Sequence, residues 1–403
     1  MMKKILEEAK RISEQIVEDR RQLHQMPELG LDLPRTKAYV VKRLKEMGYV
    51  PQEIGKSGIT VLAGGKIPGK VFLLRADMDA LPIKEETGLP FASRSDNMHA
   101  CGHDTHTAML LGAARILKDR EDEIQGTVKL FFQPGEEILA GAKEAVDAGL
   151  LHNPKVDAAM MVHILSGLDG PTGVIGILGD GACYASCDWF RVDIQGKGGH
   201  GAVPESTVSP INIASAINAA IQEIMAMVVP PAQRAVMTVG EMHSGNAGNI
   251  IPDSAYMIGT IRTFDEGVRS LIKEKLVKVS ESIAVSRGGS AKVAFSQSTP
   301  AAINDPKMRE MALASLAELL GPEGVVDMEK VFDGAFARVS GSEDFAYIAE
   351  KVPSLVSFLF AGNHKEGFTY FSHHPRTDFK EDYFYVGAAS YAQIAMDWLI
   401  KNR

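Results

Sequence analysis

Three short apolar segments of the sequence each run directly into charged or metal-ligating side chains. The segments "KVFLLRADMD" (70–79), "GTVKLFFQPGEE" (126–137) and "DAAMMVHI" (157–164) have the continuous apolar character of parallel strands buried on both faces. A helical pattern, "HTAMLLGAARILKD" (106–119), separates the first strand from the second. This alternation predicts an α/β domain with a central, mostly parallel sheet. Because ligands bind beyond the carboxyl ends of such strands, the polar ends of all three should meet at one site.

The pattern changes after about residue 185. A strand leads into a glycine-rich loop in "DWFRVDIQGKGGHGA", and a helix, an alternating strand and a second helix follow. A chain of 403 residues is long enough for two domains. We therefore predict a smaller α+β domain of ferredoxin-like type over residues 187–297. It would be inserted between residues 1–186 and 298–403, which form the larger domain.

The charge balance and the absence of targeting signals limit the partners and the compartment. The chain has 43 basic and 51 acidic residues, a formal charge of −8, so we expect no nucleic-acid or membrane partner. The N-terminal segment predicts a single amphipathic helix, and acidic residues interrupt its apolar pattern from Glu7 onward, unlike a signal peptide. The sequence contains no run of 18 apolar residues, so no membrane span is expected. The three cysteines are an odd number, which favours a reducing, cytoplasmic location.

The stretch "MHACGHDTH" (98–106) gathers three histidines, a cysteine and an aspartate. Cys101 and His103, with one residue between them in a predicted loop, can reach one ion. A cysteine taken alone is more often an inert part of the core. The convergence of this stretch with the glutamates of "QPGEE" and with His163 at one sheet edge instead favours a metal site.

The adjacent glutamates Glu136 and Glu137 can divide the chemical work. One of them would bind metal, and the other would take a proton from water that the metal makes more acidic. The alternative is an exposed helix N-terminus, where acidic side chains interact favourably with the helix dipole.

Seven motifs together carry a family resemblance. They are "LLRADMDALPIKEETGLPFAS", "MHACGHDTHTAMLLGAA", "FFQPGEE", "GKGGHGAVP", "GNAGNIIPDS", "GTIRTF" and "GSEDFAYI". In this order the chain resembles the amidohydrolase branch of the aminoacylase/carboxypeptidase metallopeptidases, which includes hippurate hydrolases and auxin-conjugate hydrolases. The resemblance implies a zinc-peptidase-like catalytic domain, a lid and dimerisation domain, and hydrolysis of the amide bond of N-acyl-L-amino acids. It also implies two divalent metal ions per subunit, Zn²⁺ or Mn²⁺, with Co²⁺ and Ni²⁺ as alternatives.

The resemblance also assigns roles to residues of the predicted metal site. Glu136 would be the general acid/base, and Cys101 would be a thiolate that bridges the two metals. The remaining ligands would be His103, Glu137, His163 and His373. The last of these stands two residues before the proline of "SHHPRTDF", and the neighbouring His374 is an alternative. Asp77, Asp79 and Asp104 would orient the ligands, and His106 would either do the same or cap the following helix.

The inserted domain would contribute three further residues. The resemblance implies that His200 of the glycine loop acts across a dimer interface and stabilises the oxyanion. Asn249 and Arg262 would hold the substrate carboxylate, to which an arginine can bind through two nitrogens. Without the resemblance, His200 would be a surface loop residue and Arg262 a solvated strand residue. We expect a homodimer, or a tetramer, acting on a small N-acyl amino acid or dipeptide.

Three other functions compete with this one. A metallo-carboxypeptidase or dipeptidase could use the same bimetal centre. A non-catalytic binding protein could keep the fold, although such a protein would be expected to have lost a ligand or Glu136, and all are present. A redox or structural zinc protein could use Cys101, Cys183 and Cys187, but their spacing matches no zinc-ribbon pattern.

Overall fold

The computed structural model describes residues 2–331 and 337–403, which form two compact units. The first unit comprises Met1–Cys183, Ala302–Arg338 and Asp344–Arg403, and the second comprises Tyr184–Ala301 and Val339–Glu343. The borders predicted at 187 and 297 lie just inside the second unit. The prediction places Val339–Glu343 in the larger domain, whereas the structure groups this segment with the second unit through backbone bonds to Ala185.

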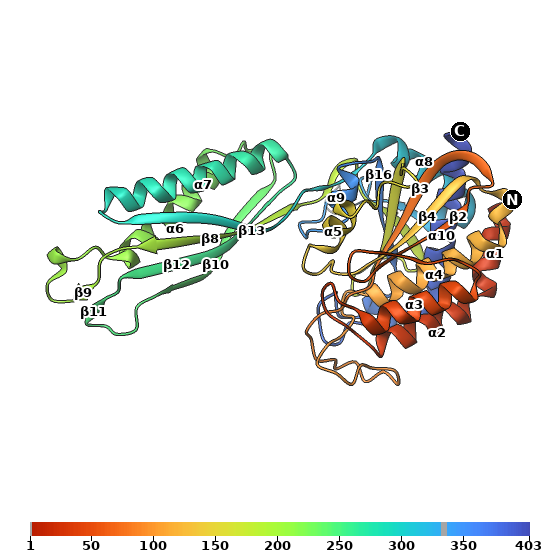
Figure 1. Cartoon of the computed structure of the whole chain (residues 1–403), viewed down its shortest axis with the longest axis horizontal. Coiled ribbons are helices and arrows are strands. Elements are labelled where there is room, and N and C mark those ends of the chain that lie inside the picture. Colours follow the sequence, from red (N-terminus) through yellow and green to blue (C-terminus); the bar gives the residue numbers. More distant parts are fainter. Residues whose placement is uncertain (1, 332–336) are drawn as a thin grey trace. The chain divides into compact units, whose positions relative to one another are not determined.

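An eight-stranded sheet forms the centre of the first unit (Figure 1). β4, β3, β5 and β16 are successive parallel neighbours, which confirms the predicted α/β fold with a mostly parallel central sheet. β5 is buried along its whole length, as its continuous apolar sequence predicts. The strand order is β1 (Gln52–Ile54), β2 (Gly58–Gly64), β4 (Gln125–Gln133), β3 (Ile67–Asp77), β5 (Ala158–Leu165), β16 (Ser354–Phe360), β6 (Val174–Ile177) and β15 (Val325–Asp327). A separate pair consists of β7 (Gly181–Tyr184) and β14 (Ala302–Asn304).

The helices of the first unit pack on this sheet and on each other. α4 and α10 contact each other and β3, and α5 and α9 also pack together. α10 is buried on almost every side, which suits its apolar sequence. The helices are α1 (Met2–Arg11), α2 (Ser13–His24), α3 (Pro34–Glu46), α4 (His103–Asp119), α5 (Gly141–Asp147), α8 (Pro306–Leu320), α9 (Ala346–Ala349) and α10 (Phe384–Lys401).

Two helix boundaries differ from the sequence prediction. The single N-terminal helix is interrupted at Ile12, which leaves helical geometry while its side chain packs against the core. α4 begins at His103, so this residue lies in the first helical turn and not in a loop. The apolar pattern starts only at His106 because the first turn carries polar side chains that are nevertheless buried.

The strands β3 and β5 separate near their carboxyl ends. Their pairing runs from Phe72 and Ala158 to Arg75 and Met161. Tyr391 of α10 then stands between them: its hydroxyl donates to the carbonyl of Arg75 (2.7 Å) and accepts from the N–H of Val162 (2.9 Å). The sheet therefore opens on the side where the polar strand ends gather, which is the usual place for a ligand site in an α/β sheet.

The second unit is a four-stranded antiparallel sheet covered by two helices. Its strands lie in the order β10 (Ala235–Ser244), β12 (Ser254–Thr263), β8 (Ser186–Gln195) and β13 (Ser290–Thr299). α6 (Pro210–Met227) and α7 (Glu266–Ser286) are capped by Ser209 and Asp265, whose side chains accept backbone N–H groups of the first turn. This chain order and strand order confirm the predicted ferredoxin-like domain. A small pair, β9 (Gly199–His200) with β11 (Ile250–Ile251), extends from it.

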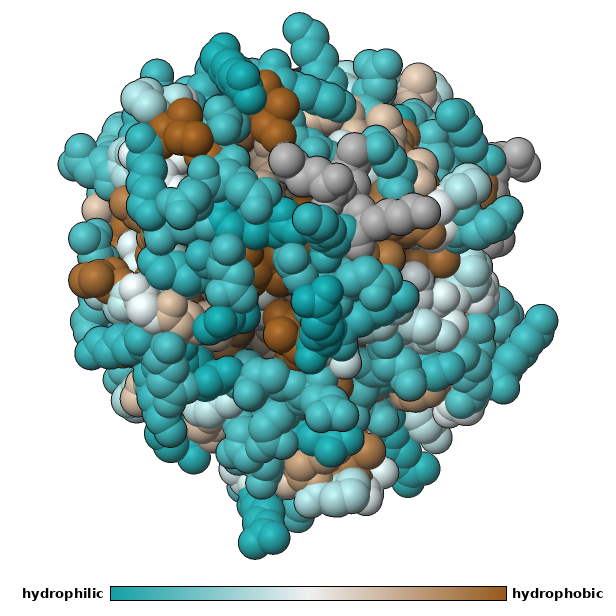
Figure 2. Space-filling view, turned by 90° about the vertical axis from the view of Figure 1, so that its right-hand side faces the viewer, coloured by the Kyte–Doolittle hydropathy of each residue, from teal (hydrophilic) through white to brown (hydrophobic). Residues whose placement is uncertain are grey.

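Hydrophilic residues cover most of the face shown in Figure 2, and hydrophobic residues appear there as small separate patches. None of the helices in the described part of the chain combines the length and the apolarity that crossing a membrane requires.

The position of Tyr391 between the two strands gives a stability prediction. Tyr391→Phe removes the partner of the buried Val162 N–H and should lower the free energy of unfolding by about 1–3 kcal/mol. Tyr385→Phe, at a half-buried position of the same helix, should cost clearly less. Denaturant unfolding of both variants measures this, and equal effects would contradict the bridging role of Tyr391.

Candidate metal centre

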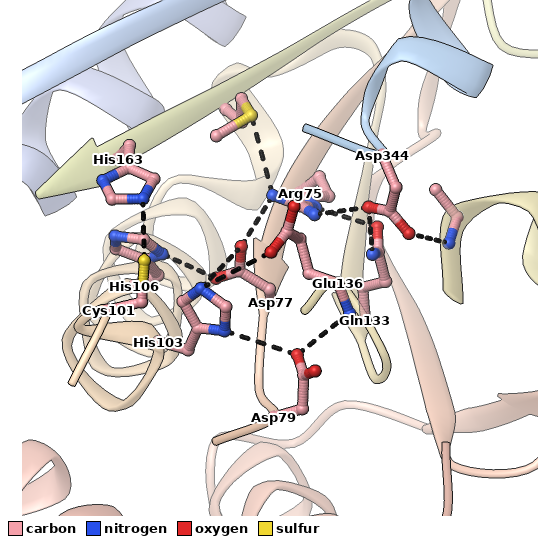
Figure 3. Close-up of polar contacts among 12 residues, drawn as sticks. Arg75, Asp77, Asp79, Cys101, His103, His106, Gln133, Glu136, His163 and Asp344 are labelled. Atoms are coloured by element: carbon pink, nitrogen blue, oxygen red, sulfur yellow. Dashed lines mark hydrogen bonds and ion pairs between the residues drawn. The ribbon is translucent and has the colours of Figure 1, made fainter. Parts of the chain in front are cut away.

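Three strand ends and the start of α4 bring Glu136 close to three of the predicted ligands, Cys101, His103 and His163 (Figure 3). Asp77 ends β3, the turn after β4 carries Glu136, and His163 lies on β5. Gly102 joins Cys101 to the first helical residue with φ of 85°, a conformation that favours glycine. A Cβ atom there would lie 2.4 Å from the side chain of Ile164, so only glycine lets the loop approach β5 this closely.

The side-chain atoms that could bind metal form overlapping groups, in each of which all ligating atoms lie within 4.8 Å of one another. Two of the groups share the thiol of Cys101. A third group contains both glutamates and one histidine, His103, which also belongs to the first group. These three of the five groups among the described residues are Cys101, His103 and His163; Cys101, Glu137 and His373; and His103, Glu136 and Glu137. The structure therefore brings together all five predicted ligands and Glu136.

Neighbouring groups hold two of the histidines in place. The Nδ1 of His163 lies 2.7 Å from the carbonyl oxygen of Ile164, which leaves Nε2 at 3.5 Å from the sulfur of Cys101. The Nδ1 of His103 lies 3.3 Å from Asp79, while its Nε2 faces Glu137 at 3.8 Å. Both rings thus present Nε2 to the cluster and use Nδ1 for orientation, as metal-binding histidines commonly do.

The geometry distinguishes His373 from His374. The Nε2 of His373 lies 3.5 Å from Glu137, and the backbone N–H of His373 donates to the carbonyl of Ala100. His374 instead stacks on Tyr370, with ring centroids 4.2 Å apart, and its Nδ1 accepts from a backbone N–H. His373 adopts a φ of 69°, a left-handed conformation that costs a non-glycine residue roughly 1–2 kcal/mol. The chain therefore accepts backbone strain where it turns His373 toward the cluster.

The protonation equilibria of the cluster favour a bound cation. Burial raises the pKa of the Cys101 thiol and raises the pKa of Glu137 to about 7. Burial lowers the pKa of His163; it would also lower that of His103, but Asp77 and Asp79 outweigh it and raise the pKa. The ionised forms of Cys101 and Glu137 are thus unfavourable unless positive charge lies beside them.

Two buried atoms of the cluster support the same conclusion. The Nε2 of His103 and the Oε1 of Glu137 have no hydrogen-bond partner among the described residues. Both belong to the ligand groups, and buried polar atoms are normally paired. The combination of thiolate sulfur, imidazole nitrogen and carboxylate oxygen suits a divalent transition metal. The residues present therefore fit a metal centre.

The three aspartates that the sequence assigned to ligand orientation all lie buried around the cluster. Asp79 accepts the backbone N–H groups of Glu136 (3.0 Å) and Glu137 (3.1 Å), so one carboxylate joins both glutamates to His103. Asp77 contacts Arg75 and the Nδ1 of His106. Asp104 accepts from Arg20 (2.9 Å) and lies 2.7 Å from the Nδ1 of His24.

Sequence reasoning missed the buried groups that contact these aspartates. Arg20 and His24 come from α2, about eighty residues before Asp104, and His24 also contacts Glu85. Arg75 donates to Asp344, which also accepts from Gln133. Nothing in the local pattern links such distant residues. His99, which was not predicted as a ligand, is buried with neither ring nitrogen hydrogen-bonded within the described chain, and burial lowers its pKa to about 4.

The other two cysteines do not join the cluster. The buried thiol of Cys183 donates to the carbonyl of Ala302. Neither Cys183 nor Cys187 belongs to a group of potential metal ligands in the part of the chain that the structure describes. This arrangement does not support a structural zinc site built on the three cysteines.

The predicted residues of the second unit occupy two different places in it. His200 and Asn249 are neighbours, because His200 pairs with Ile250 and the N–H of Gly201 donates to the carbonyl of Asn249. Arg262 lies near the other end of β12, where it donates to the hydroxyl of Ser342 (3.0 Å). Arg262 is eight residues along β12 from Ser254, which at about 3.3 Å per residue is roughly 26 Å. The structure thus brings His200 and Asn249 together but separates both from Arg262.

Comparison with known proteins adds independent evidence. Residues 73–397 match the family described as "Peptidase family M20/M25/M40". Thermostable carboxypeptidase 1 of Saccharolobus solfataricus is 37% identical over 98% of each chain. N-acetyl-L-cysteine deacetylase of Bacillus subtilis is 38% identical over 87% of this chain and 81% of its own.

A crystal structure is also similar along nearly the whole chain. It is that of a Bacillus subtilis protein described as a dinuclear metal binding peptidase from the M20 family, with a TM-score of 0.82 and 32% identity. The match covers 98% of this chain and 100% of that one. The chain therefore belongs to peptidase family M20/M25/M40 and is a metal-binding hydrolase.

Proposed function

We propose that this chain hydrolyses the amide bond of N-acyl-L-amino acids to a carboxylic acid and a free amino acid, with two divalent metal ions per chain. The observation that carries this proposal is the sharing of the Cys101 thiol between two ligand groups, with the carboxylate of Glu136 beside them. His103 and His163 would complete one metal site with Cys101, and Glu137 and His373 the other. Zn²⁺ or Mn²⁺ suits these ligands, with Co²⁺ and Ni²⁺ as alternatives.

Glu136 acts as the general acid and base in this proposal. The metals, when bound, supply the acidification of water and the polarisation of the amide carbonyl. Glu136 takes the proton of the attacking water at its carboxylate and later donates it to the departing amine nitrogen. Its backbone N–H donates to Asp79, and a carboxylate oxygen of Glu136 lies 4.0 Å from the Nε2 of His103.

The second unit would bind the substrate carboxylate and the developing oxyanion. Arg262 and Asn249 hold the carboxylate, and His200 stabilises the oxyanion. The roughly 26 Å along β12 is much longer than an N-acyl amino acid, so one chain cannot place both ends of this strand on one substrate. This supports a homodimer, or a tetramer, in which His200 and Asn249 serve the partner's site. We also propose a cytoplasmic location.

A second candidate function uses the same centre. A metallo-carboxypeptidase or dipeptidase differs only in the group on the acyl side of the scissile amide. The similarity to a thermostable carboxypeptidase favours it, whereas the similarity to an N-acetyl-L-cysteine deacetylase favours the amidohydrolase.

Metal removal tests the proposal directly. The unmutated protein should contain about two divalent metals per chain and cleave N-acetyl or N-benzoyl amino acids. Chelation should abolish hydrolysis, and added metal should restore it. Elemental analysis measures the metal content, and amine release measures hydrolysis. Full activity of metal-free protein would contradict the proposal. Faster cleavage of dipeptides than of N-acyl amino acids would favour the second candidate.

The two glutamates should give different phenotypes. Glu136→Gln should keep both metals but lower kcat by at least ~10²-fold, because an amide cannot take the proton from water. Glu137→Gln should instead weaken metal binding, because one ligand is lost. Metal titration and steady-state kinetics separate the two effects. The reverse pattern would show that the assignment of roles is wrong.

A mixed dimer tests whether His200 acts across the interface. His200→Ala and Glu136→Gln chains should each be nearly inactive as homodimers. In a mixed dimer with a trans-acting histidine, one site carries both defects and the other carries neither, so activity should reappear. No recovery in purified mixed dimers would place His200 at the site of its own chain.

The substrate should need a free α-carboxylate. A site built to hydrogen-bond a group can reject analogues without it by ~10⁴-fold, so C-terminal amides should hardly be cleaved. Arg262→Ala should lose most of kcat/KM for the acid. It should also lower the ratio of kcat/KM for the acid to kcat/KM for the amide. Arg234→Ala, an exposed arginine of the same unit, should leave the ratio unchanged. Equal cleavage of acid and amide by the unmutated protein would rule out this role for Arg262.

A further inference from the structure

We propose that His106 is a positioning residue of the metal centre and not a ligand. It connects Asp77 at the end of β3 to the backbone of Ile164 on β5, and through Ile164 it fixes the ring of His163. The inference rests on the proposed function, in which His163 binds metal.

Both ring nitrogens of His106 are already committed. Its Nε2 accepts from the backbone N–H of Ile164 at 2.8 Å, so the lone pair of that nitrogen is occupied. Its Nδ1 lies 2.6 Å from a carboxylate oxygen of Asp77, whose other oxygen accepts from Arg75. Because a carboxylate accepts, the Nδ1 carries the proton and donates. Asp77, His103 and His106 lie close enough to hold an ion, yet His106 has no lone pair left for one.

The separation of β3 and β5 explains why a histidine is needed at this position. Beyond Arg75 and Met161 the two strands no longer pair, so β5 loses its backbone partner on that edge. Tyr391 pairs with the N–H of Val162, and His106 pairs with the N–H of Ile164, two residues further along the strand. Ile164 is fully buried, and an unpaired N–H there would cost about 1–3 kcal/mol.

Ile164 passes this constraint on to the metal ligand. Its N–H donates to His106, and its carbonyl accepts from the Nδ1 of His163. The rings of His106 and His163 are also in edge contact, with centroids 4.5 Å apart. The Nε2 of His163 therefore points at Cys101 only while Ile164 is held in place. Mutation of a group that orients a metal ligand in this way typically lowers metal affinity by about 10–100-fold.

Two substitutions separate the two contacts of His106. His106→Gln places an amide near the position of Nε2 and can still accept from Ile164. His106→Asn places an amide near the position of Nδ1 and can still donate to Asp77, but it leaves the N–H of Ile164 unpaired. Thr107→Val is a matched control: it removes a buried hydrogen bond from the next residue to the backbone carbonyl of the same Asp77 (2.7 Å).

Cobalt is the probe. Metal-free full-length protein of each variant is titrated with Co²⁺ against a competing chelator, and the visible absorption of bound Co²⁺ reports ligand geometry. His106→Asn should still bind two Co²⁺ at saturation, but with affinity lowered by ~10–100-fold and with shifted absorption bands. His106→Gln should recover a large part of the affinity. Thr107→Val should unfold at lower temperature while keeping the affinity and spectrum of the unmutated protein.

Each contrary result overturns the proposal in its own way. Loss of one bound Co²⁺ in His106→Asn at saturation would make His106 a ligand. Unchanged affinity and spectrum would remove its positioning role, and an equal loss in Thr107→Val would mark the effect as general destabilisation. If His106→Asn does not fold, His106→Gln decides: its spectrum must differ less from the unmutated protein than that of His106→Ala. A protein that binds two Co²⁺ but cleaves no amide would refute the proposed function and leave this test intact.

Discussion

Negative charge is buried at the carboxyl end of the sheet in the first unit, and the arrangement of this unit depends on groups that compensate that charge. Asp77, Asp79 and Asp104 are almost completely buried, and an ionised carboxylate is costly there unless it is paired. Arg75 pairs with Asp77, and Arg20 with Asp104, while Asp79 accepts two backbone N–H groups. The protein thus supplies its own compensation for the aspartates. The thiol of Cys101 and the carboxylate of Glu137 are the groups for which a divalent cation is the natural partner.

This compensation connects the centre to distant parts of the chain. Arg20 lies on α2, yet it contacts Asp104 beside the proposed ligand His103, together with the acidic residues Asp378 and Glu381 near α10. Removing one partner from such a buried network costs about 3–5 kcal/mol, because the other charge stays buried without compensation. α2 is therefore part of the framework of the candidate metal centre, although none of the proposed ligands lies on it.

The sequence was sufficient for the features that depend on local periodicity or on a motif. The apolar strands predict the sheet edge at which Glu136 and His163 lie. The motifs indicate Cys101 and His103 as candidate metal ligands. The start of α4 was misplaced because its first turn is polar, and the apolar pattern that marks a helix begins only afterwards. The distant partners could not be found, because Arg20 meets Asp104, and Arg75 meets Asp344, only after folding. Val339–Glu343 joins the second unit through backbone bonds that leave no trace in a local pattern.

The second unit imposes a further constraint through the length of its central strand. β12 is paired along its whole length with β8 on one side and with β10 on the other, so it cannot bend to bring its two ends together. His200 and Asn249 lie beyond one end, and Arg262 lies near the other. If all three act on one small substrate, they must come from two chains, whatever the position of the second unit relative to the first. The distance between the two ends of β12 follows from the rise of a β-strand alone. The argument for two chains therefore applies to any ligand much shorter than β12.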